Sequence, residues 1–108
     1  MSEAEFFDLS ELQRRRAVTG KSYLEFLRID AMSAGVYLLP SGSTDPQTPH
    51  KEDELYYVVR GRARMRAGAE DKVVSVGSVI FVAAGVEHRF HNIEEELTVL
   101  VFFAPAED

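Results

Sequence analysis

The sequence predicts an all-β domain, a sandwich or a small barrel, preceded by one short helix. The chain has 108 residues, about one domain on the usual scale of roughly 100 to 200 residues. After Gly20 the apolar residues fall in short runs rich in Val, Tyr, Phe and Leu, which Gly, Pro, Ser, Asp and Glu separate. Eight such runs at close spacing are typical of sandwiches and barrels. We therefore expect residues 1–108 to form a single domain, with residues 1–20 as an N-terminal extension.

The N-terminal extension contains the one expected helix, in the segment DLSELQRRRAV. Asp8 or Ser10 is suited to begin this helix, and Gly20 is suited to end it. The three arginines at positions 14–16 form a shorter block than the roughly five or six like charges that are typical of interaction tails. We interpret them as part of a solvated or interface helix.

Eight strands are expected, with turns at residues 41–44, 68–71 and 93–96. The expected strands are Tyr23 to Ile29, Gly35 to Leu39, Leu55 to Val59, Arg62 to Ala67, Lys72 to Val76, Val79 to Val82, His88 to His91, and Leu97 to Phe103. Residues 97–103 are apolar on both faces, so both faces need to be buried. A chain this small covers two faces most easily by pairing with a second copy. We therefore expect a homodimer.

Charge and composition exclude several classes of function. Eighteen acidic and 12 basic residues give a net charge of −6, which repels a polyanion, so we expect no nucleic-acid partner. The chain has no cysteine, which leaves histidine and carboxylate as its strong metal ligands and requires no oxidising compartment. No stretch approaches the roughly 20 apolar residues of a membrane span. We expect a soluble cytoplasmic protein with no membrane partner.

All three histidines lie in two segments of the chain. His50 lies in TPHKEDELYYVVRG, where imidazole and several carboxylates would suit a divalent cation, although a polar loop entering a strand would have the same composition. His88 and His91 lie in GSVIFVAAGVEHRFHN, on opposite sides of one strand. Because Phe90 shares the face of His88, we expect His88 to point inward and His91 to lie at the surface. An inward histidine is also a common core residue, and the spacing alone leaves both interpretations open.

The first of these segments resembles the first sequence motif of the cupins, a superfamily of small β-barrels. That motif is a glycine, five residues, a His-x-His pair, three or four residues, a glutamate, six residues and a glycine. Residues 42–61 match it with Gly42, His50 as the second histidine, Glu54 and Gly61. Thr48 stands where the motif has its first histidine.

The second segment resembles the second cupin motif, which is a glycine, five residues, a proline, one residue, a glycine, two residues, a histidine, three residues and an asparagine. Residues 77–92 match it with Gly77, Gly85, His88 and Asn92, and Ala83 stands in the place of the proline. Two motifs at full spacing are a strong signal for the fold. They are a weaker signal for any one activity, because cupins include dioxygenases, isomerases, decarboxylases, lyases, storage proteins and sensor domains.

The resemblance implies one cupin barrel, of the jelly-roll or double-stranded β-helix type, in which His50, Glu54 and His88 hold one divalent transition metal: Fe, Mn, Ni, Cu or Zn. Because position 48 is a threonine, the remaining ligands are two histidines and one carboxylate. This set resembles the two-histidine, one-carboxylate triad that leaves coordination positions open on non-haem Fe(II). Glu52 is the fallback ligand. The alternative is that the three side chains hydrogen-bond one another and bind no metal.

His50 and Glu54 can share an ion only if the chain bends between them. In an extended strand four residues span about 13 Å, whereas metal–ligand bonds are about 2 Å long. Pro49 restricts the backbone, and residues 51–53 are poor strand formers. We therefore expect a turn or bulge between the two ligands.

Aromatic residues near the expected ligands suggest a small-molecule pocket lined by Tyr37, Tyr56, Phe81 and Phe90, although for most of them filling a small barrel is the better explanation. Two classes of function remain open. The first is a metal-dependent dioxygenase, isomerase or lyase that acts on a small organic molecule, with Tyr56 or Glu52 as the candidate acid or base. The second is a non-catalytic binding protein, with or without a structural metal, which needs no such group.

Overall fold

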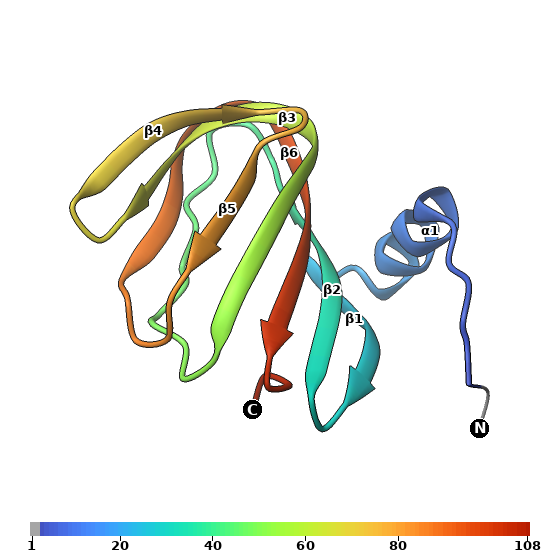
Figure 1. Cartoon of the computed structure of the whole chain (residues 1–108). Helices are drawn as coiled ribbons and strands as arrows, with labels where there is room; N and C mark the ends of the chain where they lie inside the picture. The colour runs from blue at the N-terminus through green and yellow to red at the C-terminus, as the bar shows by residue number, and fades with distance from the viewer. Residues whose placement is uncertain (1–2) are drawn as a thin grey trace.

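Six strands and one helix make up residues 3–108, the part of the chain that the computed structural model describes (Figure 1). In chain order these elements are α1 (Leu9–Thr19), β1 (Tyr23–Ile29), β2 (Met32–Leu39), β3 (Asp53–Ala67), β4 (Glu70–Ser75), β5 (Val79–Val82) and β6 (His88–Ala104). Every strand pairing is antiparallel. The expected all-β fold with one short N-terminal helix is confirmed.

Strands β3 and β6 form a long central ribbon. The strand order in the sheet is β1-β2-β6-β3-β4, and β5 pairs with the first part of β3. The pairing of the ribbon runs from Asp53 opposite Ala104 to Ala67 opposite His88. Figure 1 shows the sheet curling along this ribbon, with α1 on the outside beside β1 and β2. The curl gives the sheet the inside and outside of a barrel.

The prediction of eight strands is wrong, because two pairs of expected strands are continuous. Residues 55–59 and 62–67 both belong to β3, and residues 88–91 and 97–103 both belong to β6. The expected turn at residues 93–96 lies inside β6, where Glu95 pairs with Arg62. The pairing register shifts three times between Val58 and Arg64. Such bulges bend a strand without ending it, so polar residues that look like a turn in the sequence mark a bend in the ribbon.

Gly61 lies at the centre of this bend. Its φ of 98° is in the left-handed region that side chains rarely adopt. A Cβ atom at this position would also collide with the carbonyl oxygen of Glu96 on the facing strand. Only glycine meets both requirements, so Gly61 allows the two strands to bend together while they stay paired.

Burial alternates along both strands of the ribbon, as a barrel with a filled interior requires. On β3 the side chains of Tyr56 and Val58 are fully buried, whereas Tyr57 between them is 40% exposed. On β6 the residues at positions 97, 99, 101 and 103 are buried, as expected. Leu100 and Phe102 on the other face are half-buried. The inner faces form one apolar core, which surrounds the site described below.

Helix α1 begins after Asp8 and ends at Gly20, in agreement with the expected helix. Gly20 has a φ of 71° and its amide donates to the carbonyl of Ala17, which closes the last turn. Leu12 is the one buried helix residue, so α1 packs lightly against the barrel. No helix within residues 3–108 is long and apolar enough to span a membrane.

Candidate metal centre

Three side chains converge inside the barrel: His50, Glu54 and His88. Each offers one ligand atom, and these atoms lie within 4.8 Å of one another. Nε2 of His88 lies 3.0 Å from Oε1 of Glu54, and Nε2 of His50 lies 3.7 Å from the same oxygen. The side chains of Glu54 and His88 are each 1% exposed, and that of His50 is 18% exposed. The structure thus brings together the three residues that the two motifs suggest.

The curvature of the ribbon places Glu54 next to His88. Glu54 is at the start of β3, opposite Phe103, and His88 is at the other end of the ribbon, opposite Ala67. The expected bend before Glu54 is also present, because the chain turns at residues 51 and 52 before β3 begins. His50 therefore reaches the carboxylate that an extended chain would keep about 13 Å away.

The imidazole of His88 presents one nitrogen to Glu54 and has the other occupied. The backbone carbonyl of Val86 lies 2.9 Å from Nδ1, so the Nδ1 proton is donated there. Nε2 then faces the Glu54 carboxylate. Neither Nε2 nor either oxygen of Glu54 has a hydrogen-bond partner within residues 3–108. A buried carboxylate beside an imidazole lone pair is costly, and a cation or a proton between them removes that cost.

The pKa of His88 reflects its contact with Glu54. Burial lowers the pKa of His88, but the adjacent Glu54 carboxylate and the Val86 carbonyl outweigh burial, so the pKa is raised.

The distance of 3.0 Å between Nε2 of His88 and Oε1 of Glu54 also suits a shared ion. Two ligand atoms that each lie about 2.1 Å from one cation are about 3 Å apart when they subtend a right angle. Two imidazoles and one carboxylate form a donor set that suits divalent transition metals, so the residues present fit such an ion.

His50 is oriented by the C-terminal segment. Oε2 of Glu107 lies 3.0 Å from Nδ1 of His50, so the other ring nitrogen, Nε2, faces Glu54. The ring of Phe103 packs edge-on against the imidazole at a centroid distance of 5.0 Å. Burial raises the pKa of Glu107, although the charge of His50 opposes this shift. The contact has the form of the carboxylate–histidine pairs that orient metal ligands in proteins.

A buried polar network supports the same end of the barrel. Asp45 is 2% exposed, and its carboxylate accepts hydrogen bonds from the hydroxyl of Tyr37 at 2.9 Å and the amide of Phe90 at 2.9 Å. Asp45 also accepts from Nε2 of Gln47 at 2.6 Å. Oε1 of Gln47 in turn accepts from the hydroxyl of Tyr56 at 2.8 Å and lies 3.2 Å from Nε2 of His50. The network fixes Gln47 against His50, one of the three candidate ligands.

Gln47, Asp45 and Glu107 were absent from the sequence-based site. The motif directs attention to Thr48, but Thr48 is exposed, and Gln47 beside it is the residue that contacts His50. An isolated aspartate in a loop and a glutamate near the C-terminus carry no local signal. Only the fold shows that Asp45 is enclosed and that Glu107 returns to the barrel.

The remaining predicted site residues divide into two groups. Tyr56 and Phe90 are buried with their rings 5.0 Å apart, and Tyr37 is buried beside Asp45. Phe81 was expected to line the interior, but it lies on the outer face and is 63% exposed. Glu52 is buried, but its carboxylate accepts from the amide of Asp108 at 3.3 Å and does not join the three ligand atoms.

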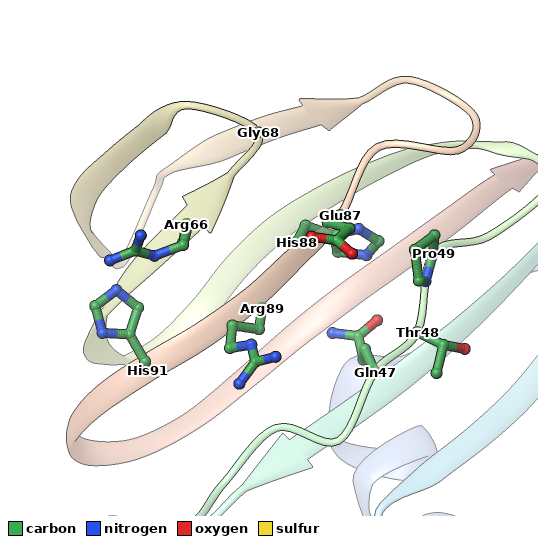
Figure 2. A pocket seen from close by; sticks show the side chains of 9 residues that line it. All are labelled: Gln47, Thr48, Pro49, Arg66, Gly68, Glu87, His88, Arg89 and His91. Atoms are coloured by element: carbon green, nitrogen blue, oxygen red, sulfur yellow. The ribbon is translucent and has the colours of Figure 1, made fainter.

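Two cavities adjoin the centre. The inner cavity has a volume of about 160 Å³. It is lined by Tyr23, Tyr37, Gln47, His50, Glu54, Val101, Phe103 and Glu107. The outer cavity has a volume of about 540 Å³. Figure 2 shows it between the loop that carries Gln47, Thr48 and Pro49 and the strands that carry Arg66 and His91. His91 pairs with Asp71 at 3.0 Å on this outer side, as expected for a residue on the opposite face from His88.

Comparison with known sequences identifies a family. A sequence model for the cupin domain matches residues 35–104. An uncharacterized protein of Streptomyces coelicolor is 52% identical over 101 residues, which cover 94% of this chain and 96% of that protein.

Comparison with solved structures gives the same fold. TT1209 from Thermus thermophilus matches with a TM-score of 0.77 at 24% identity, over 95% of this chain and 99% of that one. KdgF from Halomonas matches with a TM-score of 0.70 at 19% identity, over 77% of this chain and 76% of that one. The DMSP lyase DddQ from Ruegeria pomeroyi matches with a TM-score of 0.66 at 23% identity, over 70% of this chain. The matched region spans 39% of the lyase chain, so the likeness is one of fold.

Proposed function

The chain belongs to the cupin family, and from this premise we propose that it binds a divalent transition metal and acts on a small organic molecule. The observation that carries the proposal is the meeting of His50, Glu54 and His88, whose inward-facing nitrogen and oxygen atoms lie close together inside the barrel. In this proposal the three side chains hold one ion per chain, and Glu107 holds the ring of His50 in position.

A bound ion at this centre would supply a Lewis acid, or a redox centre if the metal is iron. The chain supplies the surroundings. Tyr56 and Phe90 are buried and pack against each other, and the hydroxyl of Tyr56 is held by Gln47. Burial raises the pKa of Tyr56, and the charge of Glu54 raises it further, so this hydroxyl stays protonated and acts as a donor. In this proposal the substrate lies in the inner cavity, which His50 and Glu54 line.

The reaction class within this proposal is a dioxygenase, an isomerase or a lyase. A two-histidine, one-carboxylate set is the arrangement found in non-haem iron oxygenases. Among the proteins that share the fold is an enzyme named as a DMSP lyase. The identity of the bound metal would distinguish these classes, because iron favours oxygen chemistry and other ions favour Lewis-acid chemistry.

We also propose a cytoplasmic location, which is compatible with a chain that has no cysteine and needs no oxidising compartment.

A non-catalytic binding protein is the second candidate, and one observation favours it. The two residues suited by sequence to act as acid or base are engaged elsewhere. Tyr56 donates to Gln47, and Glu52 accepts from the amide of Asp108. A binding protein needs neither group. Turnover of a bound small molecule by the metal-loaded protein would favour the enzyme, and reversible capture without turnover would favour the binding protein.

We also propose a homodimer that is formed through the outer face of the ribbon. Six apolar side chains form a grid there, in which Leu55 pairs with Phe81 and Phe102, and Tyr57 pairs with Val79 and Leu100. We call these six residues the outer apolar face. Phe81 and Val79 are 63% and 61% exposed. Contiguous exposed apolar surface of this kind is typical of an interface.

The first experiment is elemental analysis of protein purified without a histidine tag or chelator. The expected result is a near-stoichiometric transition metal in the wild type and its loss in His88→Ala. His91→Ala is the matched control, because His91 is on the opposite face of the same strand and should leave the metal content unchanged. If no metal binds after reconstitution with Fe, Mn, Ni, Cu and Zn in turn, the metal-dependent function is wrong.

A further inference from the structure

The side-chain amide of Gln47 is held in one orientation. Its nitrogen Nε2 donates to the carboxylate of Asp45 at 2.6 Å, and Asp45 is 2% exposed. Because a carboxylate only accepts, the amide cannot turn over without losing this hydrogen bond. The oxygen Oε1 is therefore at the opposite end, where it accepts from the hydroxyl of Tyr56 at 2.8 Å. The same oxygen lies 3.2 Å from Nε2 of His50.

The contact between Gln47 and His50 brings two acceptors together. The carboxylate of Glu107 lies 3.0 Å from Nδ1 of His50, so Nδ1 is the nitrogen that carries the proton. In the neutral imidazole Nε2 then has a lone pair and no proton. Oε1 of Gln47 is also an acceptor, and two acceptors at 3.2 Å repel each other. A cation between them, or a second proton on His50, removes this repulsion.

The position of Gln47 suits a shared cation. Two donor atoms that each lie about 2.1 Å from one ion are about 3 Å apart when they subtend a right angle, and Oε1 of Gln47 is 3.2 Å from Nε2 of His50. The same nitrogen of His50 lies 3.7 Å from Oε1 of Glu54. All three residues line the inner cavity. The nitrogen of His50 that faces Glu54 therefore also faces the oxygen of Gln47.

The loop before β3 turns Gln47, and not Thr48, toward His50. Pro46 and Pro49 flank the pair, and each proline fixes its own φ and restricts the residue before it. Thr48 stands where the first motif has a histidine, but it is exposed. Figure 2 shows the side chains of Gln47 and Thr48 leaving the loop in different directions. The neighbouring residue thus offers the donor atom that the motif position does not.

We propose that Oε1 of Gln47 is a fourth ligand of the metal ion, in addition to the three candidate ligands. This inference rests on the proposed function, because it requires an ion at the centre. Amide oxygens coordinate divalent cations in proteins, and a neutral oxygen adds a donor without changing the charge of the ligand set. Asp45 is the positioning residue, because its carboxylate holds the amide with the oxygen toward His50. Four protein ligands also leave fewer positions on the ion for a substrate than three do.

The first test measures the affinity of the chelator-treated protein for Zn²⁺. Gln47→Met keeps the length of the side chain and removes the oxygen, so the affinity should fall by at least about tenfold, the lower limit for loss of a group that only supports a ligand. Thr48→Val is the matched control on the same loop and should leave the affinity unchanged, because Thr48 is exposed. Equal affinities in Gln47→Met and Thr48→Val would overturn the proposal.

The second test uses the unmutated protein, because a lower affinity alone does not distinguish a ligand from a residue that only positions His50. The chain has three side-chain carboxamides, those of Gln13, Gln47 and Asn92. Coordination through Oε1 withdraws electron density from the amide, so in isotope-labelled protein Zn²⁺ should shift the carboxamide NMR signals of Gln47 and leave the other two in place. The signals that are missing in Gln47→Met assign this residue. If they stay in place while Zn²⁺ binds, Gln47 is not a ligand.

A crystal structure of the zinc-loaded protein gives the direct measurement. The proposal requires Oε1 of Gln47 within about 2.0–2.2 Å of the ion, the usual length of a zinc–oxygen bond. A water molecule between Oε1 and the ion, or an ion held by the three candidate ligands alone, would refute this inference and leave the proposed function standing. If the wild type binds no transition metal, the proposed function fails and this inference fails with it, so the two failures are distinguishable.

Discussion

The orientation of each imidazole is set by the ring nitrogen that faces away from the centre. His88 donates its Nδ1 proton to the carbonyl of Val86, and Nδ1 of His50 contacts the carboxylate of Glu107. In both residues Nε2 faces Glu54, and in His50 this nitrogen also contacts Oε1 of Gln47 at 3.2 Å. The two supports differ in kind, because a backbone carbonyl is fixed by the strand while a carboxylate near the C-terminus depends on its own anchoring. Glu107 is anchored by its amide, which donates to Ser33 at 3.0 Å.

Removing the support of His50 should weaken metal binding without abolishing it. We expect Glu107→Ala to lower the affinity for the ion by about 10- to 100-fold, as is usual when an outer carboxylate is lost. Glu107→Gln keeps an oxygen acceptor and should retain part of the affinity. Titration of the chelator-treated protein with the metal found by elemental analysis measures these values. Glu95→Gln, at an exposed position of β6, is the control, and equal affinity in Glu107→Ala and Glu95→Gln would contradict the role of Glu107.

At this scale the sequence predicts the three candidate ligands that the structure brings together, and it does not predict the residues around them. His50, Glu54 and His88 stand at fixed spacings, so a motif can identify them. Gln47 and Glu107 reach the centre through loop geometry and the return of the C-terminal segment, which no spacing encodes.

The ribbon of β3 and β6 is the element that assembles the centre, because its bend brings opposite ends together. The bend depends on Gly61, where the backbone has a positive φ and where the facing strand leaves no room for a Cβ atom. Gly77 has a similar φ of 93°, but nothing lies within 4 Å of the place where its Cβ atom would be. A comparison of substitutions at Gly61 and Gly77 therefore distinguishes the free-energy cost of the positive φ from the free-energy cost of the collision.

We expect Gly77→Ala to lower the free energy of unfolding by about 1–3 kcal/mol, the usual cost of a side chain in this conformation. Gly61→Ala should cost more than Gly77→Ala, because the new methyl group also displaces the backbone at Glu96. Denaturant unfolding of both variants measures the difference. Equal losses in the free energy of unfolding would mean that β3 and β6 can move apart at the bend at no cost in stability, and would contradict the expected role of Gly61.

Elements were predicted well where one face is apolar and poorly where a strand bends. The strand at residues 23–29 was predicted with its observed bounds, and so was the strand at residues 79–82. Residues 93–96 were predicted as a turn because three consecutive glutamates follow an isoleucine. A strand at the outer surface tolerates such charges, and its partner supplies Arg62 opposite Glu95. Local composition cannot distinguish this bend from a turn.

At the scale of the whole molecule, the outer apolar face is an exposed apolar surface without a partner within the described residues. Its exposed aromatic residues are unusual on a chain with a net charge of −6, which otherwise favours a solvated surface. The face also explains why both sides of residues 97–103 are apolar. One side fills the barrel, and the other contributes Leu100 and Phe102 to the outer apolar face.

Light scattering of the wild type should therefore give twice the 12.1 kDa mass of one chain. Phe81→Glu places a charge in the proposed interface, at one of its most exposed residues, and should shift the protein toward the monomer. Val18→Glu, at an exposed position of α1 away from this face, is the control. A wild-type mass of about 12 kDa would refute the dimer.

The bend at Gly61 also determines how finely the centre can be adjusted. Glu54 and His88 are held by opposite ends of one ribbon, so the distance between their ligand atoms depends on the curvature between them. A slightly flatter ribbon would widen the gap, and a more curved one would narrow it, with every ligand residue left in place. In the proposed metal centre, substitutions at the bulges between Val58 and Arg64 would therefore change which ion radius fits, although these bulges lie along the strand from Glu54. The curvature of the ribbon therefore sets the distance between Nε2 of His88 and Oε1 of Glu54.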